Sequence, residues 1–248
     1  MSILIGVPGV IARLLLVSAV GLGPLEAYNL GNQLYARKDY AGAAQAYERA
    51  LAAGPSAAAH YNLGNALFKT GRIGRAILHY RRARALDPAD PDVATNLDFA
   101  RSYRVDKLKS DAGPFARTLD GLLHRLSRRA AAEAAAVCCV LASLLLATWI
   151  VRRAPALGVG AALFAAGALY GLASERAWAA EIASRPAVLV VPEAEALSGP
   201  GPEYKQILLV HDGTEVRIRE TRGDYALVQL PGGSGGWLQK SAVERVYP

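Results

Sequence analysis

A nine-residue segment occurs twice in the first third of the chain, and it constrains the fold more than any other sequence feature. Residues 27–35 read AYNLGNQLY and residues 60–68 read HYNLGNALF, so the second copy starts 60 − 27 = 33 residues after the first. Similarity at this period is typical of solenoids built from stacked helical hairpins. Leucines at helical spacing supply an apolar face, while Gly31 and Ala43 are small enough for two helices to approach closely.

This region resembles the tetratricopeptide repeat family. The residues that carry the resemblance are Leu30, Gly31, Ala43, Tyr47, Ala50 and Pro55 in the first copy, and Leu63, Gly64, Ala76, Tyr80, Ala83 and Pro88 in the second. The resemblance implies helical hairpins whose concave groove holds a peptide or a protein. A third copy is incomplete: residues 96–97 repeat residues 62–63, but Asp98 stands where glycine is expected. We therefore expect a repeat region over residues 27–108, with residues 91–108 forming a helix that caps it.

The groove implied by the resemblance is lined by the first helix of each pair. Its candidate partner-binding residues are Tyr28, Asn29, Asn32, Asn62, Asn65, Lys69 and Asn96. Asparagine side chains at these positions either contact a bound peptide or form hydrogen bonds within the scaffold. The sequence leaves both interpretations open.

Residues 1–26 have the outline of a secretory signal, because an apolar run over residues 14–22 follows Arg13. The bulky Leu25 fits poorly at a cleavage site after Ala27. Three interpretations remain: a cleaved signal peptide, an uncleaved N-terminal anchor, or a misplaced start codon. A signal or an anchor would direct the chain to a membrane.

Two apolar runs in the middle of the chain predict a transmembrane hairpin over residues 130–174. Residues 134–151 form a run of 18 positions without charge, and residues 154–174 form a run of 21, each long enough to cross a bilayer as a helix. Only Arg152 and Arg153 separate the runs, so the two helices must pack antiparallel. The chain is expected to cross the inner membrane twice, or three times with an N-terminal anchor.

A basic amphipathic helix is predicted over residues 114–129, just before the hairpin. Its apolar side carries Phe115, Leu119, Leu122, Leu123 and Leu126. Such a helix either lies along the lipid headgroups or serves as a solvated linker. The net charge of +7 is partly carried by arginines beside the apolar runs, which favours membrane flanks over nucleic-acid binding.

Positive charges flank both ends of the hairpin, so they do not decide its orientation. A secretory signal would place the repeats outside the cytoplasm, and two spans would return the C-terminal domain to the same side. In a Gram-negative source that side is the periplasm.

Residues 187–247 predict a small β-barrel, because short β-branched runs at residues 188–191, 215–219 and 225–230 alternate with turn sequences. This part resembles the bacterial SH3-like family. The resemblance is carried by residues 197–201 (LSGPG), 213–214 (GT), 223–225 (GDY) and 236–238 (GWL). It implies binding of peptides or cell-wall components. Candidate surface residues are Tyr204, Tyr225 and Trp237, although a large aromatic such as Trp237 is also expected in the core of so small a barrel.

The order of these parts resembles the BatE-type proteins of the bacterial Bat aerotolerance operon family. That resemblance implies membrane partners with von Willebrand factor A domains and a role in stress tolerance. We therefore expect a membrane-anchored scaffold that binds protein partners through its repeats. The alternative is a cell-envelope anchor or sensor whose barrel binds peptidoglycan or peptides.

An enzymatic role is not expected, because the sequence shows no paired nucleophile and base, no phosphate-binding loop and no metal-ligand pattern. Cys138 and Cys139 are adjacent within an apolar run, and the four histidines are scattered. No catalytic residue, metal or cofactor is predicted.

Overall fold

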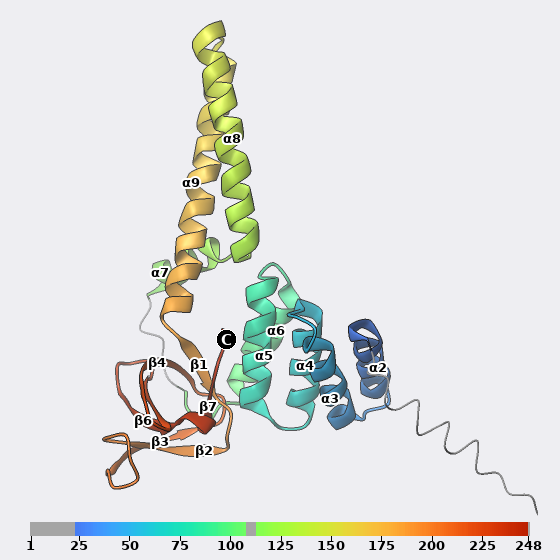
Figure 1. The fold of residues 1–248 in the computed structure, drawn as a ribbon, viewed down its shortest axis with the longest axis vertical. Helices are drawn as coiled ribbons and strands as arrows, with labels where there is room; N and C mark the ends of the chain where they lie inside the picture. Colours follow the sequence, from blue (N-terminus) through green and yellow to red (C-terminus); the bar gives the residue numbers. More distant parts are fainter. Residues whose placement is uncertain (1–22, 108–112, 248) are drawn as a thin grey trace, which may run out of the picture.

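The structure is a computed structural model that describes residues 23–107 and 113–247 (Figure 1). Helical hairpins come first, two long helices follow, and an antiparallel sheet forms the C-terminal part, which confirms the expected fold class. Most of the predicted signal or anchor over residues 1–26 lies outside the described residues. Helix α2 (Pro24–Ala36) begins before position 27, since a proline at the first helical position is compatible with a helix start.

Five helices form the repeat region. They are α2, α3 (Tyr40–Leu51), α4 (Ala57–Lys69), α5 (Ile73–Leu86) and α6 (Pro91–Ser102). Glycines set the spacing within each hairpin: a Cβ on Gly31 would lie 2.5 Å from the Tyr47 ring, and one on Gly64 would lie 2.7 Å from the Tyr80 ring. Each tyrosine ring therefore packs directly on the backbone of the preceding helix, which leaves no room for a larger residue there.

Helices α8 (Arg128–Arg152) and α9 (Pro155–Ala183) pack along each other and project away from the rest of the molecule (Figure 1). Both are long and apolar enough to cross a membrane, and most of their side chains are exposed. Close helix contact uses small residues, since a Cβ on Gly171 would lie 2.9 Å from the Cβ of Ala135. Helix α9 continues past the apolar run that ends at Ser174, because residues 175–183 (ERAWAAEIA) are rich in good helix formers.

Helix α7 (Pro114–Leu123) corrects the expectation of one helix over residues 114–129. The α9 side chains of Tyr170, Ser174 and Trp178 donate hydrogen bonds to the carbonyl groups of Leu122, Leu123 and Leu126, respectively. These bonds satisfy carbonyl groups at the end of α7, so the chain can turn there without leaving them unpaired. Ser127 then caps α8 by accepting a hydrogen bond from the backbone N–H of Ala130.

Residues 186–247, here called the β-domain, contain seven strands. They are β1 (Pro186–Leu189), β2 (Glu193–Leu197), β3 (Gln206–His211), β4 (Glu215–Arg222), β5 (Tyr225–Gln229), β6 (Gly235–Gln239) and β7 (Val243–Arg245). They form one antiparallel sheet in the order β3-β2-β6-β5-β4-β1-β7, with β3 and β7 at its edges. The predicted β-branched run at residues 215–219 lies in β4, the run at residues 225–230 covers β5, and the run at residues 188–191 overlaps the end of β1. Alternate residues such as Val216 and Ile218 are buried in the core of the domain.

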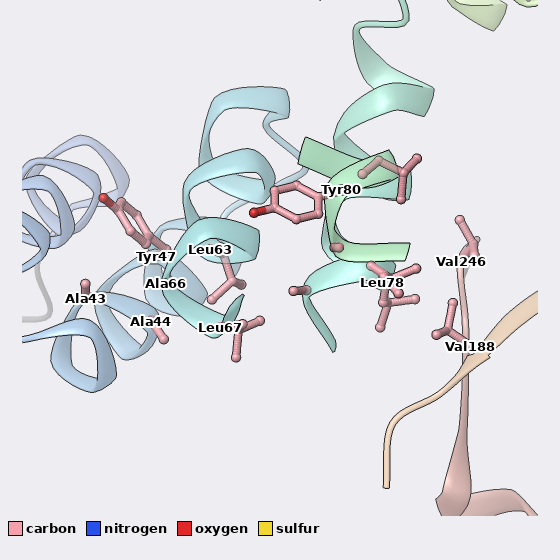
Figure 2. Packing of buried hydrophobic residues seen from close by; sticks show 14 residues of the cluster. Ala43, Ala44, Tyr47, Leu63, Ala66, Leu67, Leu78, Tyr80, Val188 and Val246 are labelled. Carbon is pink, nitrogen blue, oxygen red and sulfur yellow. The ribbon is translucent and has the colours of Figure 1, made fainter. Parts of the chain in front are cut away.

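The β-domain packs directly on the last repeat. Figure 2 shows Val188 and Val246 beside Leu78 of α5, and all three belong to one buried cluster that extends into the repeats. In the first repeat the equivalent of Leu78 is Gln45 (78 − 33 = 45), which is exposed. The expected capping helix over residues 91–108 ends at Ser102, and the β-domain covers the outer side of α5.

Candidate functional site

The predicted groove residues of the first repeat form a hydrogen-bonded set. Asn32 Oδ1 accepts a hydrogen bond from the Tyr47 hydroxyl at 2.8 Å and another from Asn62 Nδ2 at 3.2 Å. Asn62 Nδ2 also donates to the Tyr28 hydroxyl at 3.0 Å. Burial raises the pKa of Tyr47 to about 12, so its hydroxyl stays protonated and available as a donor.

The same set recurs one repeat later. Asn65 Oδ1 accepts from the Tyr80 hydroxyl at 2.7 Å and from Asn96 Nδ2 at 3.0 Å, and Asn96 Nδ2 also donates to the Tyr61 hydroxyl at 2.9 Å. This recurrence makes the bonds a property of the repeat and not of a single site. We call the four side chains Asn32, Asn62, Asn65 and Asn96 the asparagine ladder.

Each amide of the asparagine ladder uses only one of its two ends in these bonds. In the described part of the chain, no hydrogen bond is recorded for Nδ2 of Asn32 and Asn65, or for Oδ1 of Asn62 and Asn96. The asparagine ladder therefore offers, in chain order, a donor, an acceptor, a donor and an acceptor. The backbone of a peptide carries the complementary groups at every residue.

Two other predicted groove residues, Asn29 on α2 and Lys69 on α4, are exposed. Sequence reasoning missed three aromatic residues that lie beside the ladder: Phe68, Phe99 and Tyr103. Their ring centroids lie 5.5 Å apart for Phe68 and Phe99, and 5.2 Å apart for the other two pairs. We call these three residues the aromatic patch. The sequence does single out Phe99. In the third copy, which follows the second at an offset of 34 residues, Phe99 stands at the repeat position of Asn65 (99 − 34 = 65).

The β-domain has a hollow of about 470 Å³, lined by residues of several strands and loops. Tyr204 and Tyr225 both line it, together with Glu193 and Glu195. Trp237, the third predicted surface residue, is only 8% exposed, and the Arg222 guanidinium covers its ring at 5.5 Å from the centroid. The structure thus places the two tyrosines at the same hollow, whereas Trp237 does not line it.

A half-buried carboxylate joins the repeats to the β-domain. Glu215 of β4 binds Arg101 of α6 through Nε at 2.8 Å and also faces Arg81 and Arg104, each at 3.8 Å. Burial by itself raises the pKa of Glu215, but the arginines, Arg101 foremost, lower it to about 2. The repeats and the β-domain are therefore held together by charge as well as by apolar contact.

Within residues 23–107 and 113–247, no cluster of three or more His, Cys, Asp or Glu side chains is placed to hold a metal ion. The polar residues that the fold gathers are those of the asparagine ladder, the β-domain hollow and the contact around Glu215. Of these, the ladder offers oriented hydrogen-bonding groups along one surface.

Comparison with curated proteins found no match to the chain. Residues 28–91 match a family model described as tetratricopeptide repeat. The match begins within α2, covers α3 to α5 and ends at the first residue of α6, so it contains the second copy of the repeated segment and all of the first copy except Ala27. It therefore identifies the helical hairpins of this part of the chain as tetratricopeptide repeats, a class of repeat that serves protein–protein interaction.

Proposed function

We propose that this protein is a non-enzymatic, membrane-anchored scaffold that captures an extended segment of a partner protein on the asparagine ladder. The observation that carries the proposal is that each ladder amide forms hydrogen bonds through only one of its two polar atoms, Oδ1 or Nδ2. The Oδ1 bonds of Asn32 and Asn65 fix the orientation of these amides, so their Nδ2 groups are preorganised as donors. A bound segment then supplies backbone carbonyl groups, and its sequence is selected by neighbouring side chains.

Helices α8 and α9 anchor the scaffold in the bacterial inner membrane in this proposal. Their exposed apolar side chains meet the lipid, and exposed Phe115 and Leu119 of α7 rest at the headgroup level. With a secretory signal or anchor at the front, the repeats and the β-domain lie in the periplasm. Reporter fusions after Asp111 and after Pro248 test the orientation, and cytoplasmic activity of both reporters would reverse it.

The resemblance to the BatE-type proteins suggests the identity of the partner: a membrane protein with a von Willebrand factor A domain, acting with this chain in stress or oxygen tolerance. An extended tail or loop of such a protein would lie in the groove. Two repeats form a short groove, so a single contact of this kind has modest affinity, and shared membrane anchoring raises the effective concentration of the two proteins.

The test uses isosteric variants of the ladder. Asn32→Asp together with Asn65→Asp keeps an oxygen that accepts from Tyr47 and Tyr80 but replaces both free Nδ2 donors by acceptors. The matched control is Gln33→Glu, the same chemical change at an exposed α2 position outside the ladder. Each tagged full-length protein is purified from native membranes in mild detergent, and the bound proteins are identified by mass spectrometry.

We expect the wild type and Gln33→Glu to retain a von Willebrand-type partner, and the double aspartate variant to lose at least nine-tenths of it. Equal helical circular dichroism in all three proteins shows that the fold is intact. Undiminished capture by the double aspartate variant would refute the role of the ladder.

The β-domain hollow favours a second candidate function. Tyr204 and Tyr225 present aromatic surface beside carboxylates, an arrangement that suits peptides or peptidoglycan stem peptides. In this alternative the chain is an envelope anchor or sensor, and the repeats extend its reach. Sedimentation of the full-length protein with purified cell walls tests it, since Tyr204→Ala with Tyr225→Ala would abolish co-sedimentation only if the hollow binds the wall.

A further inference from the structure

The aromatic patch is an exposed apolar surface at one end of the groove. Phe99 is 52% exposed and Tyr103 is 57% exposed, while half-buried Phe68 anchors both rings. Single apolar side chains on a surface need no explanation, but three aromatic rings in mutual contact form a continuous patch. Clustered aromatic residues of this kind are frequent anchors in protein interfaces.

The patch continues the ladder. Phe68 lies three residues after Asn65 on α4, and Phe99 lies three residues after Asn96 on α6, so each pair shares one helix face. Phe99 also takes the repeat position that Asn32 and Asn65 hold in the two complete repeats. Along the groove, hydrogen-bonding amides are therefore followed by an apolar surface.

The positively charged Lys69 borders the patch. Lys69 follows Phe68 at the end of α4, and it lies four residues after Asn65 on the same face. It is exposed, and no ion pair of its ammonium group is recorded among the described residues. An acidic group on a bound segment would complement this charge without breaking an existing pair.

We propose that the groove selects extended peptide segments in which one large apolar side chain lies next to an acidic residue. This inference rests on the proposed function, because the ladder must hold the backbone of the segment. The large side chain packs on the aromatic patch, and the acidic group faces Lys69. The ladder supplies affinity for any sequence, and the patch supplies the preference among sequences.

The experiment is selection from a random dodecapeptide display library by the full-length protein in nanodiscs. Three proteins are compared: the wild type, the variant Phe99→Asn with Tyr103→Ser, and the double aspartate variant of Asn32 and Asn65. Because both aromatic side chains are more than half exposed, their replacement leaves the repeat core intact. The substitution Phe99→Asn also restores the ladder residue type at the third position.

We expect the wild type to enrich peptides with an aromatic or large aliphatic residue beside Asp or Glu at least tenfold over the starting library. The patch variant still enriches peptides, but without the preference for a large apolar residue. Enrichment by the wild type without that preference, or an unchanged preference in the patch variant, overturns the inference and leaves the ladder in place. If the wild type enriches no peptide, the proposed function falls and this inference falls with it.

Discussion

Two histidines face each other across the second hairpin. His60 Nδ1 on α4 lies 3.0 Å from His79 Nδ1 on α5. Burial is the main cause that lowers the pKa of His60 to about 4, with a further contribution from Arg82. Burial likewise lowers the pKa of His79 to about 2, and His60 and Arg82 add to the effect. Both imidazoles are therefore neutral in the folded repeat. Acid stabilises the unfolded chain relative to the folded chain, because the histidines take up protons more readily when the chain is unfolded.

The stability of the repeats should fall below pH 6.5, the ordinary histidine pKa. The unfolded chain takes up protons there while the folded histidines do not, so the stabilising difference is present above pH 6.5 and is lost as the pH falls toward 4 for His60 and toward 2 for His79. Each histidine contributes at most about 1.4 kcal/mol per pH unit. Thermal unfolding of the full chain in detergent at pH 7, 6 and 5 measures the effect, and His60→Gln with His79→Gln should remove most of it. An equal decline in that variant would assign the effect to other groups.

The groove residues show what residue-level reasoning could and could not predict. The repeated segment predicted equivalent positions for Asn32 and Asn65 on two different helices, and they lie on α2 and α4. It could not show that Tyr47 and Tyr80 take the oxygen of each amide, because the tyrosines come from the second helix of each pair and their angle depends on packing. Phe99 is a different case, because the incomplete third copy keeps Asn96 but departs from the repeat at position 99.

Helix α5 begins without a cap of its own. In the first repeat, Asp39 caps α3 by accepting a hydrogen bond from the backbone N–H of Gly42 at 2.9 Å. Its equivalent in the second repeat is Arg72 (39 + 33 = 72), whose side chain makes no such bond. The cap comes instead from the β-domain, where Asp212 Oδ2 accepts from the backbone N–H of Gly74 at 2.8 Å. A Cβ on Gly74 would lie 2.1 Å from the Asp212 carboxylate, so glycine is required there.

Removing this cap should loosen the start of α5. Asp212→Ala leaves the N-terminal N–H groups of α5 without their acceptor, which costs about 1 kcal/mol. Hydrogen–deuterium exchange in the first turn of α5 should accelerate about fivefold, the factor that corresponds to this free energy. The matched variant Asp39→Ala should accelerate exchange in α3 and leave α5 unchanged. Unchanged exchange at α5 in Asp212→Ala would show that the β-domain does not cap that helix.

At the level of elements, the sequence predicted those features that local sequence patterns determine. The helical hairpins, the two apolar helices and the strands β1, β4 and β5 follow from periodicity, charge and turn residues. The end of α7 did not follow, because it depends on Tyr170, Ser174 and Trp178 meeting carbonyl groups far away in the sequence. Such contacts leave no trace in hydrophobic periodicity.

The whole molecule is joined by contacts between opposite charges. The end of the repeats carries Arg81, Arg82 and Arg101, and the β-domain presents Glu215 and Glu244 to them. Arg82 binds Glu244 at 3.0 Å and also donates to the carbonyl group of Val246 at 3.1 Å. This docking could not be predicted from the sequence, because the sequence patterns describe the repeats and the β-domain as separate units. Because the two are docked, the groove is held in a fixed orientation relative to the β-domain.

Glu215 should control this docking. The variant Glu215→Gln removes the carboxylate that Arg81, Arg101 and Arg104 share, and the loss of a partly buried, hydrogen-bonded ion pair of this kind costs about 1–3 kcal/mol. Hydrogen–deuterium exchange should therefore rise in β1 and α5, which meet at the docking surface. The control variant Glu195→Gln changes an exposed carboxylate elsewhere on the β-domain and should leave that exchange unchanged.

The same carboxylate gives the docking a pH dependence that is distinct from that of the histidines. The pKa of Glu215 is lowered from 4.5 to about 2, so its stabilising contribution is present above pH 4.5 and is lost as the pH falls toward 2. Acidification should thus loosen the repeats first, below pH 6.5, and undock the β-domain only below pH 4.5. Because Glu215→Gln carries no titrating group at this position, its docking should not weaken further across the lower range. If exchange in β1 rises together with exchange in the repeats near pH 6, the histidines and not Glu215 govern the docking.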